Sequence, residues 1–228
     1  MVLAQKIGAA VVDAKEIQLN PTLLVGSPVI ISETVRGAGA VFVNREGKRF
    51  ISELTTRDVT SAAVSKQTGG TAFEICDDKV RQSVKQTGAA FELGLAKQGA
   101  TLAELAKNAG IDPKNLEATI AQYNKYAEAG SDPDFKRPGL SAKLKVERAP
   151  FYAIEITPAI HYYMGGLKFN GKTQVINTAG KPIEGLYAAG EVTGGVHGKN
   201  RLGGNSISET ITFGRLAGEN AAAKVLGK

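Results

Sequence analysis

Apolar residues recur along several segments of this chain at spacings of three or four positions, which predict helices. In the segment after Asp112-Pro113, a typical helix start, apolar residues recur every three or four positions and share one face: Leu116, Ile120, Tyr123 and Ala127. The run Thr101-Leu-Ala-Glu104 is a capping box, which predicts a further helix ending near Asn108. Other helices are expected at 1–10, at 78–85 and at 207–226.

Strand patterns occur between these helices. Residues 40–44 and 48–52 alternate around the turn Arg45-Glu-Gly47, which predicts a hairpin. Residues 11–13, 17–19, 71–76 and 186–189 are also expected to be extended. The segment 131–142 holds two prolines and a glycine and is predicted to be a surface loop. The chain is therefore expected to mix helices and strands in an α+β arrangement.

The run from Gly185 to Ser208 is the stretch most suggestive of ligand binding. It contains seven glycines, with single polar residues such as Glu191, His197 and Arg201 spaced among them. Glycine allows the backbone to approach a ligand closely, and a helix N-terminus presents N–H groups to oxygen atoms. A flexible linker is the simpler alternative, but a linker does not normally lie between a strand and a helix with so many polar side chains.

Charge and composition narrow the possible partners. The formal net charge is +6, but the basic residues are dispersed, which argues against nucleic acid and is compatible with a small carboxylate substrate. One cysteine and two histidines allow no internal disulfide and no Cys/His metal site, so no metal is expected. We find no long apolar span and no signal-peptide pattern, so a soluble protein without a membrane span is expected. The patterns leave the bacterial periplasm and the cytoplasm both open.

Several motifs together carry a family resemblance. Besides the glycine-rich run they are Asn20-Pro-Thr22, Ser32-Glu-Thr-Val-Arg-Gly37, Val43-Asn-Arg-Glu-Gly-Lys-Arg-Phe50, Thr55-Thr-Arg-Asp58 and His161-Tyr-Tyr-Met-Gly-Gly166. In order and spacing the chain resembles the fumarate reductase/succinate dehydrogenase flavoprotein family, and most closely the soluble flavocytochrome c type of fumarate reductase. The resemblance implies an FAD-dependent oxidoreductase of anaerobic respiration that acts on a CH–CH group.

The resemblance also implies a domain organisation. Residues 1–24 would end the first part of an FAD-binding domain, 25–157 would form an inserted capping (clamp) domain, and 158–228 would be the returning part of the FAD-binding domain. No Gly-x-Gly-x-x-Gly opens a helix after a strand, although family flavoproteins hold the FAD pyrophosphate with that motif. We therefore expect an incomplete α/β FAD-binding domain. A non-catalytic capping-domain fragment is the alternative for the isolated chain.

The reaction implied by the resemblance is reduction of the C=C bond of an α,β-unsaturated carboxylate, nominally fumarate to succinate. FAD N5 would give the hydride and Arg57 the proton, while Glu33 and Arg36 would relay protons from solvent. An arginine can serve because the α-carbanion formed after hydride transfer is a very strong base. From the residues alone, Glu33 and Arg36 could equally be an ordinary ion pair three residues apart.

Substrate binding is implied for four residues. His161 and Arg201 match positions that grip a carboxylate, for which a guanidinium offers a planar fork and an imidazole a third donor. A surface arginine and a satisfied buried histidine are the simpler alternatives. Family fumarate reductases place His where this chain has Asn20, and commonly Thr where it has Ser32. Since those positions hold the second carboxylate, a urocanate- or acrylate-type substrate is a serious alternative.

The implied flavin contacts come from the C-terminal third of the chain. A positive helix end there would stabilise an anionic reduced flavin. A glycine-rich turn with an ordinary helix cap is the alternative. Succinate dehydrogenase and aspartate oxidase share the catalytic layout and are less similar. A haem, iron–sulfur or covalently flavinylated electron donor would lie outside these residues. The expected cofactor contacts are Gly165, Gly166, Gly190, Glu191, Gly203, Gly204, Asn205, Ser206 and Ile207.

Overall fold

The computed structural model of the protein describes residues 1–227 and divides into two compact units. Unit 1 combines Met1–Leu19 with the segment that begins at Ile160, and unit 2 is Asn20–Ala159. Unit 1 is thus built from both ends of the sequence, and unit 2 from its middle. Which unit binds flavin and which acts as a cap stays a prediction, because a compact fold does not by itself reveal a ligand.

Unit 2 is organised around a five-stranded sheet, in which β2, β6, β4 and β3 follow one another and β5 pairs with β6. The pairs β3–β4, β4–β6 and β5–β6 are antiparallel. Residues of β2 and β6 fall in both units. The strands are β2 (Ile17–Leu24), β3 (Val41–Val43), β4 (Ala72–Asp77), β5 (Ala96–Gly99) and β6 (Phe151–Tyr163).

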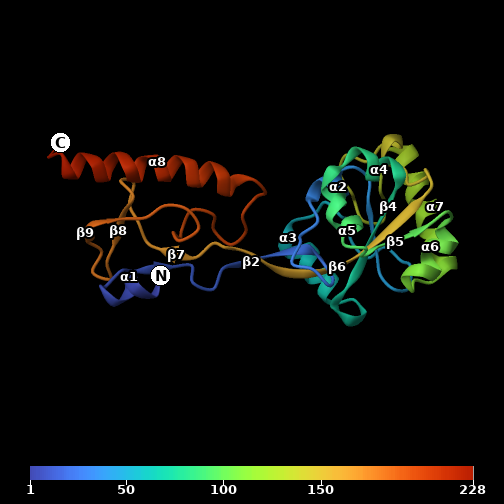
Figure 1. Ribbon diagram of the computed structural model, residues 1–228, viewed down its shortest axis with the longest axis horizontal. Helices are drawn as coiled ribbons and strands as arrows, with labels where there is room; N and C mark the ends of the chain where they lie inside the picture. Colours follow the sequence, from blue (N-terminus) through green and yellow to red (C-terminus); the bar gives the residue numbers. More distant parts are fainter. Residues whose placement is uncertain (228) are drawn as a thin grey trace. The chain divides into compact units, whose positions relative to one another are not determined.

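Helices cover both faces of this sheet (Figure 1). The alternation of β3 and β4 decides which side chain faces which layer, because successive residues of a strand point to opposite faces. Phe73 and Ile75 pack with α6 (Leu102–Ala109) and α7 (Pro113–Ala129) in one core. Ala72 and Cys76 belong to a second core. That core includes residues of α2 (Glu33–Gly37), α3 (Arg57–Ser65), α4 (Asp78–Ser83) and α5 (Gly88–Glu92).

The structure confirms the two helices that the local sequence signals predict, α6 and α7. Thr101 Oγ1 accepts a hydrogen bond from Glu104 N at 3.1 Å, and Asp112 Oδ1 accepts one from Asn115 N at 2.8 Å, so both helices begin with the predicted caps. The four residues predicted to share one face of α7 are all buried. Residues 131–141 form no helix or strand, as expected for a loop. Short 3-10 turns lie at Thr68–Gly70, Lys85–Thr87 and Ala142–Leu144.

The predicted hairpin at 40–52 is wrong in its second arm. The turn forms, since Gly47 N donates to Asn44 O at 2.9 Å, but residues 48–52 are not a strand. Strand β3 instead pairs with β4, Val41 opposite Ile75. The backbone leaves the sheet after the turn, and the Arg49 side chain there forms buried ion pairs with Glu53 and Asp132.

These ion pairs centre on the carboxylate of Glu53, which is fully buried. Arg49 donates to both of its oxygens at 2.9 Å, and Arg137 NH1 donates to Oε2 at 2.9 Å. Phe42 N donates to Oε1 at 3.2 Å, and Arg36 NH1 donates to the Glu53 carbonyl at 2.9 Å. Burial by itself lowers the pKa of Arg49, but the hydrogen bonds and charges of Glu53 and Asp132 outweigh it and raise that pKa. Glu53 therefore fastens α2, β3 and two loops to each other.

Unit 1 contains shorter strands and the longest helix. Strands β1 (Val11–Val12) and β7 (Gly166–Leu167) pair, and so do β8 (Gln174–Ile176) and β9 (Pro182–Tyr187). Helix α1 (Val2–Lys6) lies within the predicted first helix, and α8 (Asn205–Val225) begins two residues before its prediction. A small core joins Ala9, Leu167, Val175 and Ala188. The mixture of helix and sheet expected from the sequence is confirmed.

We expect Glu53→Gln to destabilise the protein by about 3–5 kcal/mol, because the change leaves the buried Arg137 without its counter-charge and leaves Arg49 with Asp132 alone. Urea unfolding measures the difference. Glu155→Gln is the matched control, since Glu155 lies on the same sheet but pairs with Arg45 at the surface, and we expect a loss below about 1 kcal/mol. Equal losses for the two variants would show that Glu53 does not hold the unit together.

Candidate active site

The predicted site residues fall into two groups, one in each unit, and each group is described by itself. In unit 2 the three residues of the predicted proton relay come together. Arg57 Nε donates to Glu33 Oε1 at 2.7 Å, and Arg36 NH2 lies 3.5 Å from the same oxygen. One carboxylate oxygen thus bridges two guanidinium groups that are far apart in the sequence.

Helix starts place these three side chains. Glu33 is the first residue of α2 and Arg36 lies three positions on, so both project from one face of a single turn. Arg57 is the first residue of α3. The side chains are exposed by 43% for Glu33, 12% for Arg57 and 2% for Arg36. The bridging carboxylate therefore reaches solvent, while the two arginines on either side of it are largely buried.

The electrostatics of Arg36 favour proton exchange. Burial lowers the pKa of Arg36, and the charges of Glu74 and Glu33 oppose that effect without cancelling it. The charge of Arg57 lowers the pKa further. A guanidinium that holds its proton less firmly than usual is suited to a proton relay.

Asn20 and Ser32 have local structural roles in unit 2. Asn20 is 2% exposed, and its Oδ1 accepts from Thr22 N at 3.0 Å and from Thr22 Oγ1 at 2.8 Å. Ser32 is the N-cap of α2, and its Oγ accepts from Thr34 N at 3.3 Å. Both side chains keep donor capacity, through the Asn20 amide NH2 and the Ser32 hydroxyl.

In unit 1 a cavity of about 400 Å³ collects five of the predicted residues. Polar groups and apolar surface meet in it, as is typical of sites for small molecules. The predicted glycines and Asn205 do not line it; Asn205 lines a separate cavity together with His197. The first cavity is lined by His161, Tyr162, Glu191, Arg201, Ser206, Ile207, Thr210 and Ile211.

Arg201 is fixed on its loop by contacts that the sequence did not reveal. Its guanidinium carbon lies 4.3 Å from the centre of the Tyr162 ring, and the residue is only 5% exposed. Gln18 Nε2 donates to the Arg201 carbonyl at 2.6 Å and to Asn200 Oδ1 at 2.7 Å. Arg201 is therefore not a mobile surface arginine. Gln18 is 183 positions away, so no local pattern could have identified it.

Glycines in unit 1 allow three segments to converge. A Cβ at Gly165 would lie 2.2 Å from Asp13 O, and one at Gly166 would lie 2.3 Å from Val192 O. Gly190 has a φ of +79°, and its N–H donates to Glu209 Oε1 at 3.1 Å. Glu209, buried on α8, was not predicted from the sequence. Close backbone packing therefore requires glycine at positions 165 and 166, and a positive φ favours it at position 190.

The remaining predicted flavin contacts lie at the start of α8 and in the segment before it. Gly203 and Gly204 form the turn before the helix, and Gly204 is its N-cap with a φ of +84°. Ile207 N donates to Gly204 O at 3.0 Å, so this N–H is used within the first turn. Glu191 Oε1 accepts from Tyr163 N at 2.9 Å.

His197 contacts Tyr162 rather than lining the cavity with Arg201. The two rings meet edge to face with centroids 5.5 Å apart, and Tyr162 Oη lies 3.5 Å from His197 Nε2. Burial lowers the pKa of His197, and the charge of Glu209 opposes that effect. His197 is therefore held mainly neutral at physiological pH, as a packing partner of Tyr162.

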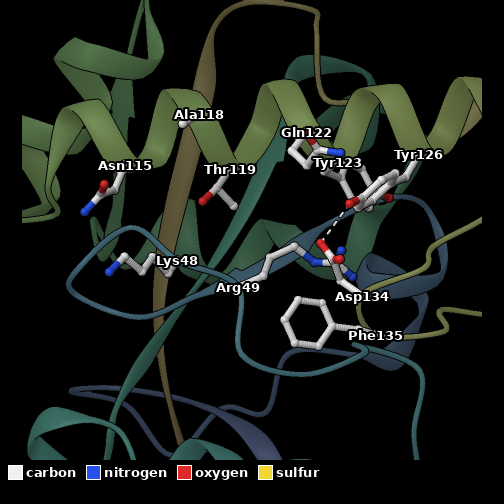
Figure 2. Close-up of a pocket in the computed structure, with 10 residues that line it drawn as sticks. All are labelled: Lys48, Arg49, Asn115, Ala118, Thr119, Gln122, Tyr123, Tyr126, Asp134 and Phe135. Carbon is white, nitrogen blue, oxygen red and sulfur yellow. Dashed lines mark hydrogen bonds between the residues drawn. The ribbon is translucent and has the colours of Figure 1, made fainter.

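Another pocket, of about 490 Å³, lies in unit 2 away from every predicted residue. Figure 2 shows α7 forming one wall, with Arg49 and Phe135 on the opposite side. The Arg49 guanidinium carbon lies 4.9 Å from the Phe135 ring centre, and Tyr126 Oη donates to Asp134 at 2.9 Å. Arg49, Tyr126 and Asp134 are thus engaged with other residues of the pocket wall.

Among residues 1–227, no three His, Cys, Asp or Glu side chains gather as a metal site would require. In the same part of the chain, no helix has both the length and the apolar character needed to cross a membrane.

Comparison with known protein families assigns the chain to one of them. The FAD binding domain family matches residues 1–207. The chain is therefore a member of that family of flavoproteins, and FAD is its cofactor.

Known relatives narrow the class further. The chain is 51% identical over 220 residues to the cytochrome-type fumarate reductase of Shewanella frigidimarina. The aligned region covers 96% of this chain and 38% of the relative. It is 43% identical to the NADH:acrylate oxidoreductase of Vibrio harveyi, covering 96% of this chain and 22% of that protein. The solved open conformation of a flavocytochrome c3 fumarate reductase superposes with a TM-score of 0.77 at 46% identity, covering 97% of this chain and 39% of that one. The chain thus spans less than two-fifths of each of these relatives.

The cavity in unit 1 fits a flavin by its chemistry. Ile207 and Ile211 expose 65% and 66% of their surfaces, an apolar area that a flat aromatic ring would cover. Ser206 and the positive end of α8 offer donors to ring oxygens.

We expect Gly166→Ala to destabilise the protein by about 1–3 kcal/mol, because the new methyl group would collide with the backbone at Val192 and force β7 away from it. Thermal or urea unfolding measures the loss. Gly171→Ala is the control: its Cβ would meet open space, and its backbone does not have a positive φ. If both variants lost equal stability, the close approach at Gly166 would not be a structural requirement.

Proposed function

We propose that this chain forms part of a flavin-dependent reductase of an α,β-unsaturated carboxylate, with fumarate as the nominal substrate. The observation that supports it best is the single Glu33 oxygen shared by Arg57 and Arg36 in unit 2. An isolated surface ion pair would need only one arginine, whereas a relay needs alternating donors and acceptors.

Arg57 is the proposed proton donor to the α-carbon. FAD, when bound, supplies the hydride that adds to the β-carbon. The resulting carbanion takes a proton from the Arg57 guanidinium. The Glu33 carboxylate then takes up a proton from solvent or from Arg36 and passes it to Arg57. The 2.7 Å hydrogen bond from Arg57 Nε to Glu33 is suited to this return step, because the acceptor already lies within transfer distance. The half-exposed Glu33 can regain its proton from solvent or from Arg36.

His161 and Arg201 are the proposed clamp for the substrate carboxylate. Both line the same cavity, and Arg201 is held over Tyr162. A preorganised guanidinium binds a carboxylate with less loss of side-chain entropy and polarises the adjacent double bond. Glu191, which lines the same cavity, is a proposed flavin contact along with Ser206 and Ile207.

The far end of the substrate is the part on which the candidates differ. Asn20 and Ser32 are neutral, so they can donate hydrogen bonds to a second carboxylate but cannot neutralise it. The similarity to the Vibrio harveyi acrylate oxidoreductase fits a substrate with one carboxylate. We propose fumarate first and a monocarboxylic acid of the acrylate or urocanate type as the alternative. A separate electron donor and the cellular compartment remain predictions from the sequence.

We expect the chain to bind FAD, and the complete protein that contains it to reduce fumarate with a chemical reductant. Absorbance and fluorescence titration with FAD measures the first, and loss of the reduced dye on addition of fumarate, acrylate or urocanate measures the second. The ranking of kcat/KM among the three acids identifies the substrate class. Tight FAD binding with no turnover of any of the acids would overturn the proposed reaction.

We expect Arg57→Ala to lower kcat for fumarate by about 10²-fold or more, since the reaction loses its general acid. Arg57→Lys should recover part of the rate, because an ammonium group can also donate. KM should change little, since Arg57 is not assigned to the carboxylate clamp. Arg45→Ala is the control, because Arg45 pairs with Glu155 at the surface of the same unit. Unchanged kcat in Arg57→Ala would remove Arg57 from the mechanism.

A further inference from the structure

Strand β4 carries a glutamate where the strand pattern calls for an apolar residue. Glu74 lies between Ala72 and Cys76, which both belong to the core under α2 and α3, so alternation turns its side chain into that core. Its neighbours across the sheet are Phe42 on β3 and Ile154 on β6. The residue is fully buried, and neither carboxyl oxygen has a hydrogen-bond partner in the part of the chain that the structure describes.

Such a group is costly in a core, because a buried carboxyl without partners loses its hydration and gains nothing in return. An unpaired buried polar group in a folded protein therefore calls for an explanation, and a catalytic role is one of the recognised ones. The hydroxyls of Ser52 and Ser61 are also buried without a partner in residues 1–227. Ser61 lies one helical turn after Arg57 on α3, the helix that carries the proposed proton donor.

Arg36 is the cation that acts most strongly on Glu74. Its guanidinium carbon lies 5.6 Å from the centre of the Phe42 ring, next to Glu74 across the sheet. Of all the charges around it, Glu74 raises the pKa of Arg36 most, and Arg36 in turn lowers the pKa of Glu74 most. The other charges acting on Glu74 are Glu53, from the segment after β3, and Arg137, from the loop after α7.

We propose that Glu74 is a positioning residue of the proton relay, which acts through Arg36 and sets how firmly the Arg36 guanidinium holds its proton. This inference rests on the proposed function of Arg57, Glu33 and Arg36. In the order Arg57, Glu33, Arg36 and Glu74 the four groups alternate between cation and carboxyl, and the last two are buried. A neutral Glu74 leaves the buried Arg36 without its inner counter-charge, so Arg36 gives a proton to Glu33 more readily. An ionised Glu74 holds that proton in place.

The pH range of the effect follows from burial. Burial raises the pKa of Glu74 to about 7, although Arg36 opposes the shift. Glu74 is therefore mainly neutral below neutral pH and becomes ionised as the pH rises through 7. Since the ionised form retains the proton on Arg36, the relay should refill more slowly at alkaline pH. Glu74→Gln keeps the neutral form at every pH and has nearly the same shape.

Infrared spectroscopy tests the titration on the chain itself, without turnover. Difference spectra between pH 5 and pH 9 should show the C=O stretch of a buried protonated carboxyl that disappears near neutral pH. The band should be missing in Glu74→Gln and present in the control Glu155→Gln. In Arg36→Met its midpoint should move to higher pH, because coupling between two sites is reciprocal. A missing band in the wild type, or a midpoint unchanged in Arg36→Met, would overturn the proposal.

Turnover of the complete FAD-loaded protein tests the consequence. The ratio of kcat for Glu74→Gln to kcat for the wild type should be near one at pH 5.5 and rise several-fold by pH 8.5, with KM unchanged. A constant ratio across the pH range would show that Glu74 is only structural and would overturn the proposal. If the wild type reduced none of the acids, the proposed function would fail, and the relay role of Glu74 would fail with it. The infrared arms would still report separately whether Glu74 and Arg36 titrate as a pair.

Discussion

The buried carboxylate of Glu53 is the constraint on which unit 2 depends. Its two oxygens bind Arg49 and Arg137, and its carbonyl receives Arg36, so three cations are neutralised or satisfied by one residue. A charge buried this deeply is tolerable only when its partners are also fixed, which makes the surrounding loops part of the core. Arg36, a residue of the proposed proton relay, is thereby anchored through Glu53. The same residue, Glu53, therefore holds the loops of unit 2 together and fixes a side chain of α2.

Prediction from the sequence succeeded where the signal was local. The residues that cap α6 and α7, and those that form the buried face of α7, lie within or next to the helices that they specify. All of these predictions were confirmed. The hairpin after Gly47 failed because its second arm is decided by Asp132 and Glu53, which bind Arg49. An ion pair across 83 positions leaves no periodic trace, so a strand pattern of the right length can still be overruled.

The candidate site shows the same division. The resemblance identified Glu33, Arg36 and Arg57, and the structure brings them together, although their roles stay proposals. The residues that position the site were missed, because Gln18 and Glu209 act through backbone groups far away in the sequence. Glu74 left a trace in the sequence, a charge between the apolar residues Phe73 and Ile75 in the middle of a strand. Such a charge reads as solvent-facing until the second face of the sheet is known to be covered.

Ser32 shows how a helix cap can limit the evolution of specificity. Its hydroxyl closes the first turn of α2, and that turn carries Glu33 and Arg36. Replacements compatible with the turn are few, since only Ser, Thr, Asp, Asn and to some extent Gly cap a helix well. Under the proposed function, in which Ser32 contacts the substrate, substitutions at this position are therefore confined to that short set. Asn20 is constrained in a different way, because it is buried and its side-chain oxygen accepts two hydrogen bonds from Thr22.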